Sequence, residues 1–138
     1  MRLEPLYRLT FQYAESWQTS AEFLGIAEGR VEGRVAGRFR GANRARRLPA
    51  GTWLPDLNGA IATDDGAAVL VRVTGYGRPD EQPTGRVVGS VTHATDDERY
   101  AWLDGVLGAL EGEVRGGREI VLDVAEVVWE PLGVTIQP

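Results

Sequence analysis

The chain contains one histidine, His93, and its imidazole is the side chain best suited to proton transfer near neutral pH. It lies in the run GRVVGSVTHAT, where apolar residues and glycine alternate with polar ones. That alternation puts His93 on the same face as three residues that favour a buried position: Val87, Gly89 and Val91. We expect His93 near the end of an inward-facing strand, either as a general acid or base or as a hydrogen-bonded structural histidine.

A carboxylate could complete an acid–base pair, and the run EIVLDVAEVVWE at 119–130 carries one on each face. Glu126 points inward if Leu122 and Val124 do, whereas Asp123 points inward if the opposite face is buried. A carboxylate in an apolar interior has a raised pKa and can act as a general acid or base. The alternative is a structural bond to an arginine or a tyrosine hydroxyl. We take His93, Asp123 and Glu126 as the catalytic candidates.

Aromatic side chains offer a surface for a flat or apolar substrate, because ligand pockets are mostly apolar with a few placed polar groups. The substrate-binding candidates are five aromatic residues and one acidic residue of the segment WLPDLNG: Tyr7, Trp53, Asp56, Tyr76, Tyr100 and Trp102. Packing in the core is the alternative for most of the aromatic ones.

Several classes of site are not indicated. There is no cysteine, the spacing of acidic residues and the single histidine does not match a metal site, and no phosphate-binding or nucleophilic-serine motif occurs in a fitting context. The net charge of −5 argues against a nucleic-acid partner, and no apolar run is long enough to cross a membrane as a helix. We expect a cytoplasmic protein with a small-molecule ligand, no metal and no cofactor, as a monomer or a homo-oligomer.

The elements that position these residues are predicted to be strands, because a period of two dominates the chain. In two further runs this period places aromatic or aliphatic residues together on one face: Tyr7, Leu9, Phe11 and Tyr13 in the first, and Val69, Val71 and Val73 in the second. Turns are expected at 62–67, 77–85 and 115–119, where Asp-Gly, proline and Gly-Gly signals occur. One helical turn is predicted at 96–101, with a strand after it.

Glycine recurs at every fourth position in GRVEGRVAGRFRG at 29–41. Its alternation predicts one long strand with arginines on the solvent face and the following residues inside: Val31, Gly33, Val35, Gly37 and Phe39. The inward glycines either leave room for a ligand or let the wall bend. Many short strands with little helix predict an all-β fold in a single domain over 1–138, most simply a closed antiparallel barrel.

The ordered segments PLYRLTF, GRVAGRFRG, LPAGTW, TDDGAAVLVRVTGYG and RYAWLDGV resemble the proteins grouped as domain of unknown function 3237. The resemblance spans nearly the whole chain. It implies a closed, lipocalin-like antiparallel barrel with an interior pocket, and it implies no particular activity.

Two functions fit these observations. The first is a cofactor-independent enzyme that performs proton transfer on a small, partly apolar substrate, as an isomerase, cyclase or lyase, because His93, carboxylates and tyrosines share an otherwise apolar wall. The second is a non-catalytic barrel that binds a small ligand, or a homo-oligomeric structural module, since no motif requires catalysis.

Overall fold

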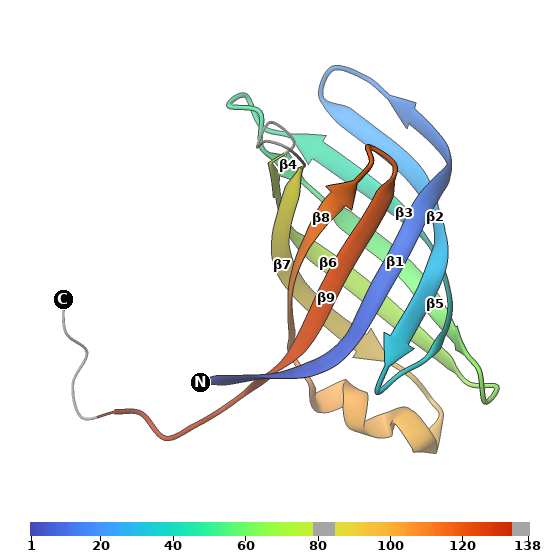
Figure 1. Cartoon of the computed structure of the whole chain (residues 1–138), viewed down its shortest axis with the longest axis vertical. Coiled ribbons are helices and arrows are strands. Elements are labelled where there is room, and N and C mark those ends of the chain that lie inside the picture. The colour runs from blue at the N-terminus through green and yellow to red at the C-terminus, as the bar shows by residue number, and fades with distance from the viewer. Residues whose placement is uncertain (79–84, 134–138) are drawn as a thin grey trace.

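The computed structural model describes residues 1–78 and 85–133, and these form one closed antiparallel barrel (Figure 1). The elements in chain order are β1 (Arg2–Gln18), β2 (Glu22–Gly33), β3 (Gly37–Arg47), β4 (Trp53–Leu54), β5 (Asp56–Thr63), β6 (Ala68–Arg78), β7 (Arg86–Ala94), the 3₁₀ helix η1 (Glu98–Gly105), β8 (Gly108–Arg115) and β9 (Glu119–Val128). Eight long strands close the ring because β1 pairs with both β2 and β9, and the two-residue β4 pairs with β3 and β6. The predicted fold class is confirmed.

The inward faces of β1, β6 and β7 are those that the alternation predicts. Tyr7, Leu9 and Phe11 of β1 are buried, as are Val69, Val71 and Val73 of β6 and Val91 of β7. These residues belong to one continuous apolar cluster that also takes in Phe39, Ile61 and Leu110. Because successive side chains of a strand point to opposite faces, the charged residues between them lie on the outside of the wall.

The prediction of one long strand over 29–41 is wrong, because the chain reverses there. β2 ends at Gly33, residues 34–36 turn, and β3 begins at Gly37, with Val31 opposite Gly37 and Gly29 opposite Phe39. Opposed residues of this hairpin are both odd-numbered or both even-numbered, and opposed residues face the same side of a sheet. The period of two therefore continues unbroken through the turn, and alternation cannot distinguish this hairpin from a continuous strand.

Close approach of neighbouring strands accounts for several inward glycines. A Cβ atom on Gly75 would lie 2.1 Å from the carbonyl oxygen of Val88, and one on Gly37 would lie 2.2 Å from that of Ala62. Neither distance is possible for a real side chain. These glycines let the strongly coiled wall of a small barrel close, as designed barrels also require, and they do not mark space for a ligand.

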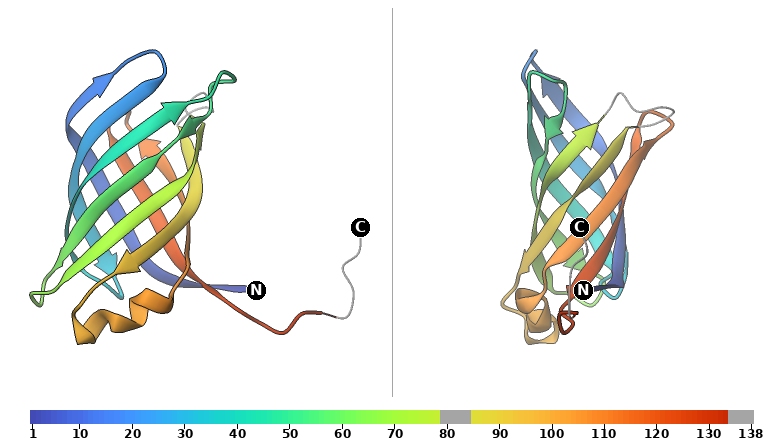
Figure 2. Two further views of the ribbon diagram at one scale, coloured as in Figure 1. Left: turned by 180° about the vertical axis from the view of Figure 1, so that it is seen from behind. Right: turned by 90° about the vertical axis from the view of Figure 1, so that its left-hand side faces the viewer.

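One end of the barrel, here called the helix end, is covered by η1 (Figure 2). Leu103 of η1 and Val35 of the β2–β3 turn are fully buried there. The predicted helical turn exists but spans 98–105 rather than 96–101, and Asp97 caps it by accepting a hydrogen bond from the Arg99 amide.

The turn at 62–67 and the turn at 115–119 are confirmed. Most of the predicted loop at 77–85 lies outside the described residues. At the other end, here called the loop end, the inward-facing Tyr13, Val87 and Ile120 are only partly buried.

Candidate functional site

Two polar side chains meet in the apolar interior near the helix end. Tyr7 extends from β1 and His93 from β7, and the Tyr7 hydroxyl lies 2.7 Å from His93 Nε2. Their rings are in an edge-on arrangement with centroids 5.7 Å apart. β1 and β7 are not neighbours in the ring of strands, so this hydrogen bond crosses the barrel interior. The side chain of His93 is 8% exposed.

Burial keeps both groups neutral. It lowers the pKa of His93 below its ordinary value of 6.5, because desolvation disfavours the imidazolium. It raises the pKa of the Tyr7 hydroxyl, because desolvation disfavours the phenolate. A neutral tyrosine therefore faces a neutral imidazole at physiological pH.

The second nitrogen of the ring has no partner. Nδ1 of His93 is buried and makes no hydrogen bond to any residue that the structure describes. If Tyr7 donates to Nε2, the ring proton is on Nδ1 and one donor is unmet. If Nε2 donates to Tyr7, both Nδ1 and the tyrosine proton are unmet. The first arrangement leaves fewer buried groups unsatisfied, so we assign the proton to Nδ1.

The two carboxylate candidates separate to opposite faces of β9. Glu126 belongs to the inward-facing series with Leu122 and Val124, but at the helix end, where its Oε1 lies 3.0 Å from Nη1 of Arg34. Asp123 lies on the outside, in a two-fold hydrogen bond with Arg8 at 2.7 and 2.9 Å that lowers the pKa of its carboxyl. The interior conformation of Asp123 that the sequence left open is not adopted.

Glu126 takes part in a cluster that fastens η1 to the barrel. The Arg34 guanidinium, which pairs with Glu126, lies 4.6 Å from the ring centroid of Trp102 in η1. On the other side of η1, the Tyr100 hydroxyl donates to Asp65 at 2.8 Å, and hydrogen bonds from Thr63 and Tyr100 lower the pKa of Asp65. Trp102 and Tyr100 are thus parts of the cover rather than of an interior wall.

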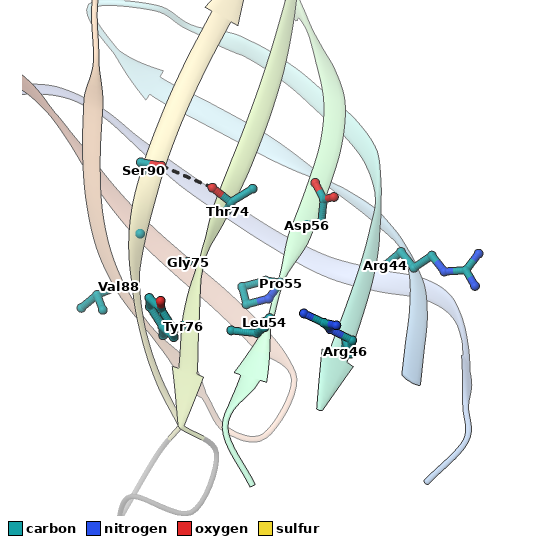
Figure 3. Close-up of a pocket in the computed structure, with 11 residues that line it drawn as sticks. Arg44, Arg46, Leu54, Pro55, Asp56, Thr74, Gly75, Tyr76, Val88 and Ser90 are labelled. Carbon is teal, nitrogen blue, oxygen red and sulfur yellow. Dashed lines mark hydrogen bonds between the residues drawn. The ribbon is translucent and has the colours of Figure 1, made fainter. Parts of the chain in front are cut away.

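The other substrate-binding candidates do not come together. Only Tyr7 lies beside His93, while Trp53 is half-buried on β4 at the loop end. Asp56 and Tyr76 lie on the outer wall, in a shallow groove of about 580 Å³ that also contains Arg44, Arg46 and Val88 (Figure 3). Thr74 and Ser90 share a hydrogen bond of 3.3 Å on its floor. Its arginines and Tyr76 are exposed, so we do not place chemistry there.

A second polar pair inside the barrel, formed by buried Asn43 and partly buried Tyr13, escaped the sequence reasoning. Asn43 of β3 is buried, donates to the Tyr13 hydroxyl at 2.9 Å and accepts from the Asp56 amide at 3.0 Å. The signal was present, because Asn43 is the polar residue at an inward position between Gly41 and Ala45. Tyr13 also meets the rings of Phe11 and Phe23 edge-on, so this end of the interior is aromatic.

Within the described ranges, no three acidic or histidine side chains gather in a way that could hold a metal ion. No helix among the same residues is long and apolar enough to cross a membrane.

Comparisons with known proteins agree with the fold. The family model described as "Protein of unknown function (DUF3237)" matches residues 1–127. The chain belongs to this family. Among curated proteins, none matches the chain in sequence at a significant level.

Solved structures with the same barrel share little sequence with this DUF3237 protein. A β-barrel-like protein of Acinetobacter baumannii is 21% identical with a TM-score of 0.79, over 91% of this chain and 94% of its own. A conserved protein of unknown function from Rhodopseudomonas palustris is 19% identical with a TM-score of 0.81, over 92% and 97%. A protein described as an enzyme from Penicillium herquei is 22% identical with a TM-score of 0.62, over 89% and 93%. At these identities the likeness establishes the fold alone.

Proposed function

We propose that this protein is a cofactor-independent enzyme that transfers a proton within a small, partly apolar substrate in the barrel interior. Isomerisation, cyclisation and lyase reactions belong to this class. The proposal rests on the buried hydrogen bond between Tyr7 and His93 and on the unpartnered Nδ1 atom. An unmet buried donor costs about 1–3 kcal/mol, so a fold that keeps one needs a reason to do so.

Tyrosine suits the role of partner in such a pair because a hydroxyl can both donate and accept. Tyr7 donates to Nε2 when the ring proton is on Nδ1, and it accepts from Nε2 when the ring is protonated there or is an imidazolium. The ring thus stays oriented by one hydrogen bond of 2.7 Å in each of its protonation states. Phenylalanine or a carboxylate could not support all three states in an apolar site.

The proposed reaction takes one proton from the substrate and returns it to the substrate, so it needs no cofactor. The favoured tautomer carries the proton on Nδ1, so the reaction starts from the less populated tautomer, in which Nε2 carries the proton and donates to the Tyr7 hydroxyl. In that tautomer Nδ1 accepts a proton from a substrate carbon next to a carbonyl group, and the electron pair of that C–H bond becomes the enolate. The same proton then passes from Nδ1 to a second atom of the substrate, and the imidazole returns to its starting state. Because burial lowers the pKa of His93, the buried imidazolium is a stronger acid than a solvated one and gives up that proton more readily.

The interior around the pair favours an uncharged substrate. Val91, Val124 and Leu110 are buried in the same cluster as Tyr7. A carboxylate or ammonium group would lose its hydration there, and the described members of this cluster offer it no opposite charge. Glu126, which pairs with Arg34 at the helix end, is not used as an acid or base in this proposal.

Deuterium exchange provides a test that does not need the natural substrate. The purified protein is incubated in D₂O with a panel of small uncharged ketones and enones, and loss of the proton next to the carbonyl is followed by NMR. We expect exchange with the native protein and a loss of about 10²–10⁴-fold in His93→Gln, the usual contribution of a general base. Thr92→Gln, the same new side chain at the adjacent outward position of β7, is the matched control.

Full exchange in a folded His93→Gln protein would exclude the mechanism. The remaining candidate is a non-catalytic ligand-binding barrel, which the partly exposed aromatic side chains at the loop end favour, Tyr13 and Phe23 among them. Compounds that broaden the signals of the protein but exchange no proton, in the native protein and in both variants, would support that second function.

A further inference from the structure

Residues 129–133, here called the C-terminal arm, follow β9 and project from the barrel. After β9 ends at Val128, residues 129–133 continue in an extended course away from the wall (Figures 1 and 2). The side chain of Trp129 is 77% exposed and that of Leu132 is 90% exposed. These are large apolar groups, and leaving both of them in water is unfavourable.

The base of this arm is held in place. Glu130 lies 3.4 Å from the amino group of Met1 and 3.7 Å from Arg2, and β1 and β9 are paired from Arg2 opposite Val128 onward. Pro131 lacks an amide proton and favours an extended backbone. Both the position at which the arm begins and the direction of its backbone are therefore restricted. The arm holds its exposed side chains away from the barrel that carries it.

An apolar groove of about 630 Å³ lies on the outer wall next to the origin of the arm. Apolar residues of four adjacent strands, β1, β9, β8 and β7, line it, among them Leu3, Pro5, Ala125, Ala109 and Val88. Charged residues that also border the groove are Arg8, Glu32, Arg34, Glu111 and Asp123. Ala109 is directly opposite Ala125, and Ala125 is opposite Pro5, so small residues form the floor. Val88, at 55% exposure, stands at the far side. We call this the wall groove.

We infer that the occupant of the wall groove is the C-terminal arm of a second copy of this chain, in a two-fold symmetric dimer. Each chain supplies one arm and one groove, and the arm points away from the barrel that carries it. A two-fold rotation can then seat each arm in the groove of the other copy, which is the self-complementary geometry of most homodimers. Trp129 would act as the anchor, the residue type most enriched among interface hot spots.

The charges around the groove fit this occupant. Arg8 and Asp123 neutralise each other at its edge, and the arm carries Glu130 together with the cations that bind it. Glu111 also lines the groove and makes no ion pair with any residue in the described ranges. In the proposed dimer it faces Arg2 at the base of the second copy's arm, and Arg2 can exchange its exposed ion pair with Glu4 for one with Glu111.

Sedimentation velocity on the full chain over a dilution series tests this inference. We expect a particle of twice the 15.0 kDa chain mass for the native protein. Trp129→Asp on the arm and Val88→Arg in the groove should each raise the dissociation constant of the dimer roughly 100-fold or more, because a symmetric dimer loses the contact twice. A chain that ends at Val128 should behave in the same way. Trp17→Asp is the matched control, because Trp17 is 56% exposed but lies at the loop end of β1, and it should leave the dimer intact.

Two results of these measurements would contradict the inference. A native protein that is monomeric at every concentration overturns the inference. A dimer that survives Trp129→Asp, Val88→Arg and the truncation as well as it survives Trp17→Asp forms through another surface, which also overturns it. Far-ultraviolet circular dichroism of each variant checks that the barrel is folded. The truncated chain tests the contribution of the arm without introducing a charged residue into the wall.

Discussion

The hydroxyl of Tyr7 and Nε2 of His93 are 2.7 Å apart across the interior of the barrel, although 86 positions separate the two residues in the chain. Three strand pairings lie between them around the wall: β7 with β8, β8 with β9, and β9 with β1. Closure of the ring brings the two side chains together. Both side chains are buried, and the first two predictions concern this pair.

Removal of the Tyr7 hydroxyl should destabilise the fold. Tyr7→Phe keeps the ring but leaves Nε2 of His93 buried without a partner, which costs about 1–3 kcal/mol in the free energy of unfolding. Urea unfolding measures this. Tyr76→Phe makes the same change on the outer wall, where Tyr76 is exposed, and should stay within about 0.5 kcal/mol of the native protein. Equal stability of the two variants would show that the buried hydrogen bond contributes nothing.

The stability of the native protein should depend on the protonation of His93. Its pKa is lowered in the folded state below the ordinary value of 6.5, so the unfolded chain takes up the proton first. The contribution of the neutral histidine is complete above pH 6.5 and is lost as the pH falls below that value toward the folded-state pKa. The free energy of unfolding of the native protein minus that of His93→Gln, measured across this range, isolates the effect from that of the carboxylates. A difference that does not change with pH would contradict it.

Alanine should not be tolerated at the glycines where strands approach closely. A Cβ atom on Gly89 would lie 2.2 Å from the carbonyl oxygen of Thr74 on the neighbouring strand, so the backbone must shift. We expect Gly89→Ala to cost about 1–3 kcal/mol or more, the usual range for overpacking. Gly105→Ala is the control, because no heavy atom lies within 4 Å of its Cβ position. Thermal unfolding of the two variants should differ by several degrees, and equal midpoints would mean that the wall relaxes freely.

Loss of the charge on Glu126 should loosen the cover at the helix end. Glu126→Gln weakens the bond to Arg34, whose guanidinium also lies over Trp102 of η1. We expect faster amide hydrogen exchange over residues 98–105 and a loss of about 0.5–1 kcal/mol, since the pair is partly exposed. Glu113→Gln breaks the exposed pair with Arg115 and should leave exchange in η1 unchanged. Unchanged exchange in Glu126→Gln as well would show that the other contacts of η1, such as buried Leu103 and the Tyr100–Asp65 hydrogen bond, are sufficient to hold it in place.

The amino-acid sequence by itself determined the wall of the barrel. Alternation identified the inward faces of β1, β6 and β7, including that of His93, because strand geometry fixes which side chains share a face. The turns at 62–67 and 115–119 followed from the conformational preferences of Asp and Gly, which act over a few residues. These are local properties of the chain, so no contact between distant segments was needed to predict them.

Tertiary structure decided everything that depends on which strands meet. The hairpin at 34–36 preserves the period of two, so only the pairing of Val31 with Gly37 reveals the reversal. The inward face of β9 was undetermined because apolar residues occupy both faces, and its register against β1 placed Glu126 inside and Asp123 beside Arg8. The partner of His93 could not be read from spacing either, since a side chain on one wall meets whatever the closed ring puts opposite it. That partner is Tyr7, and closure of the barrel is the physical reason.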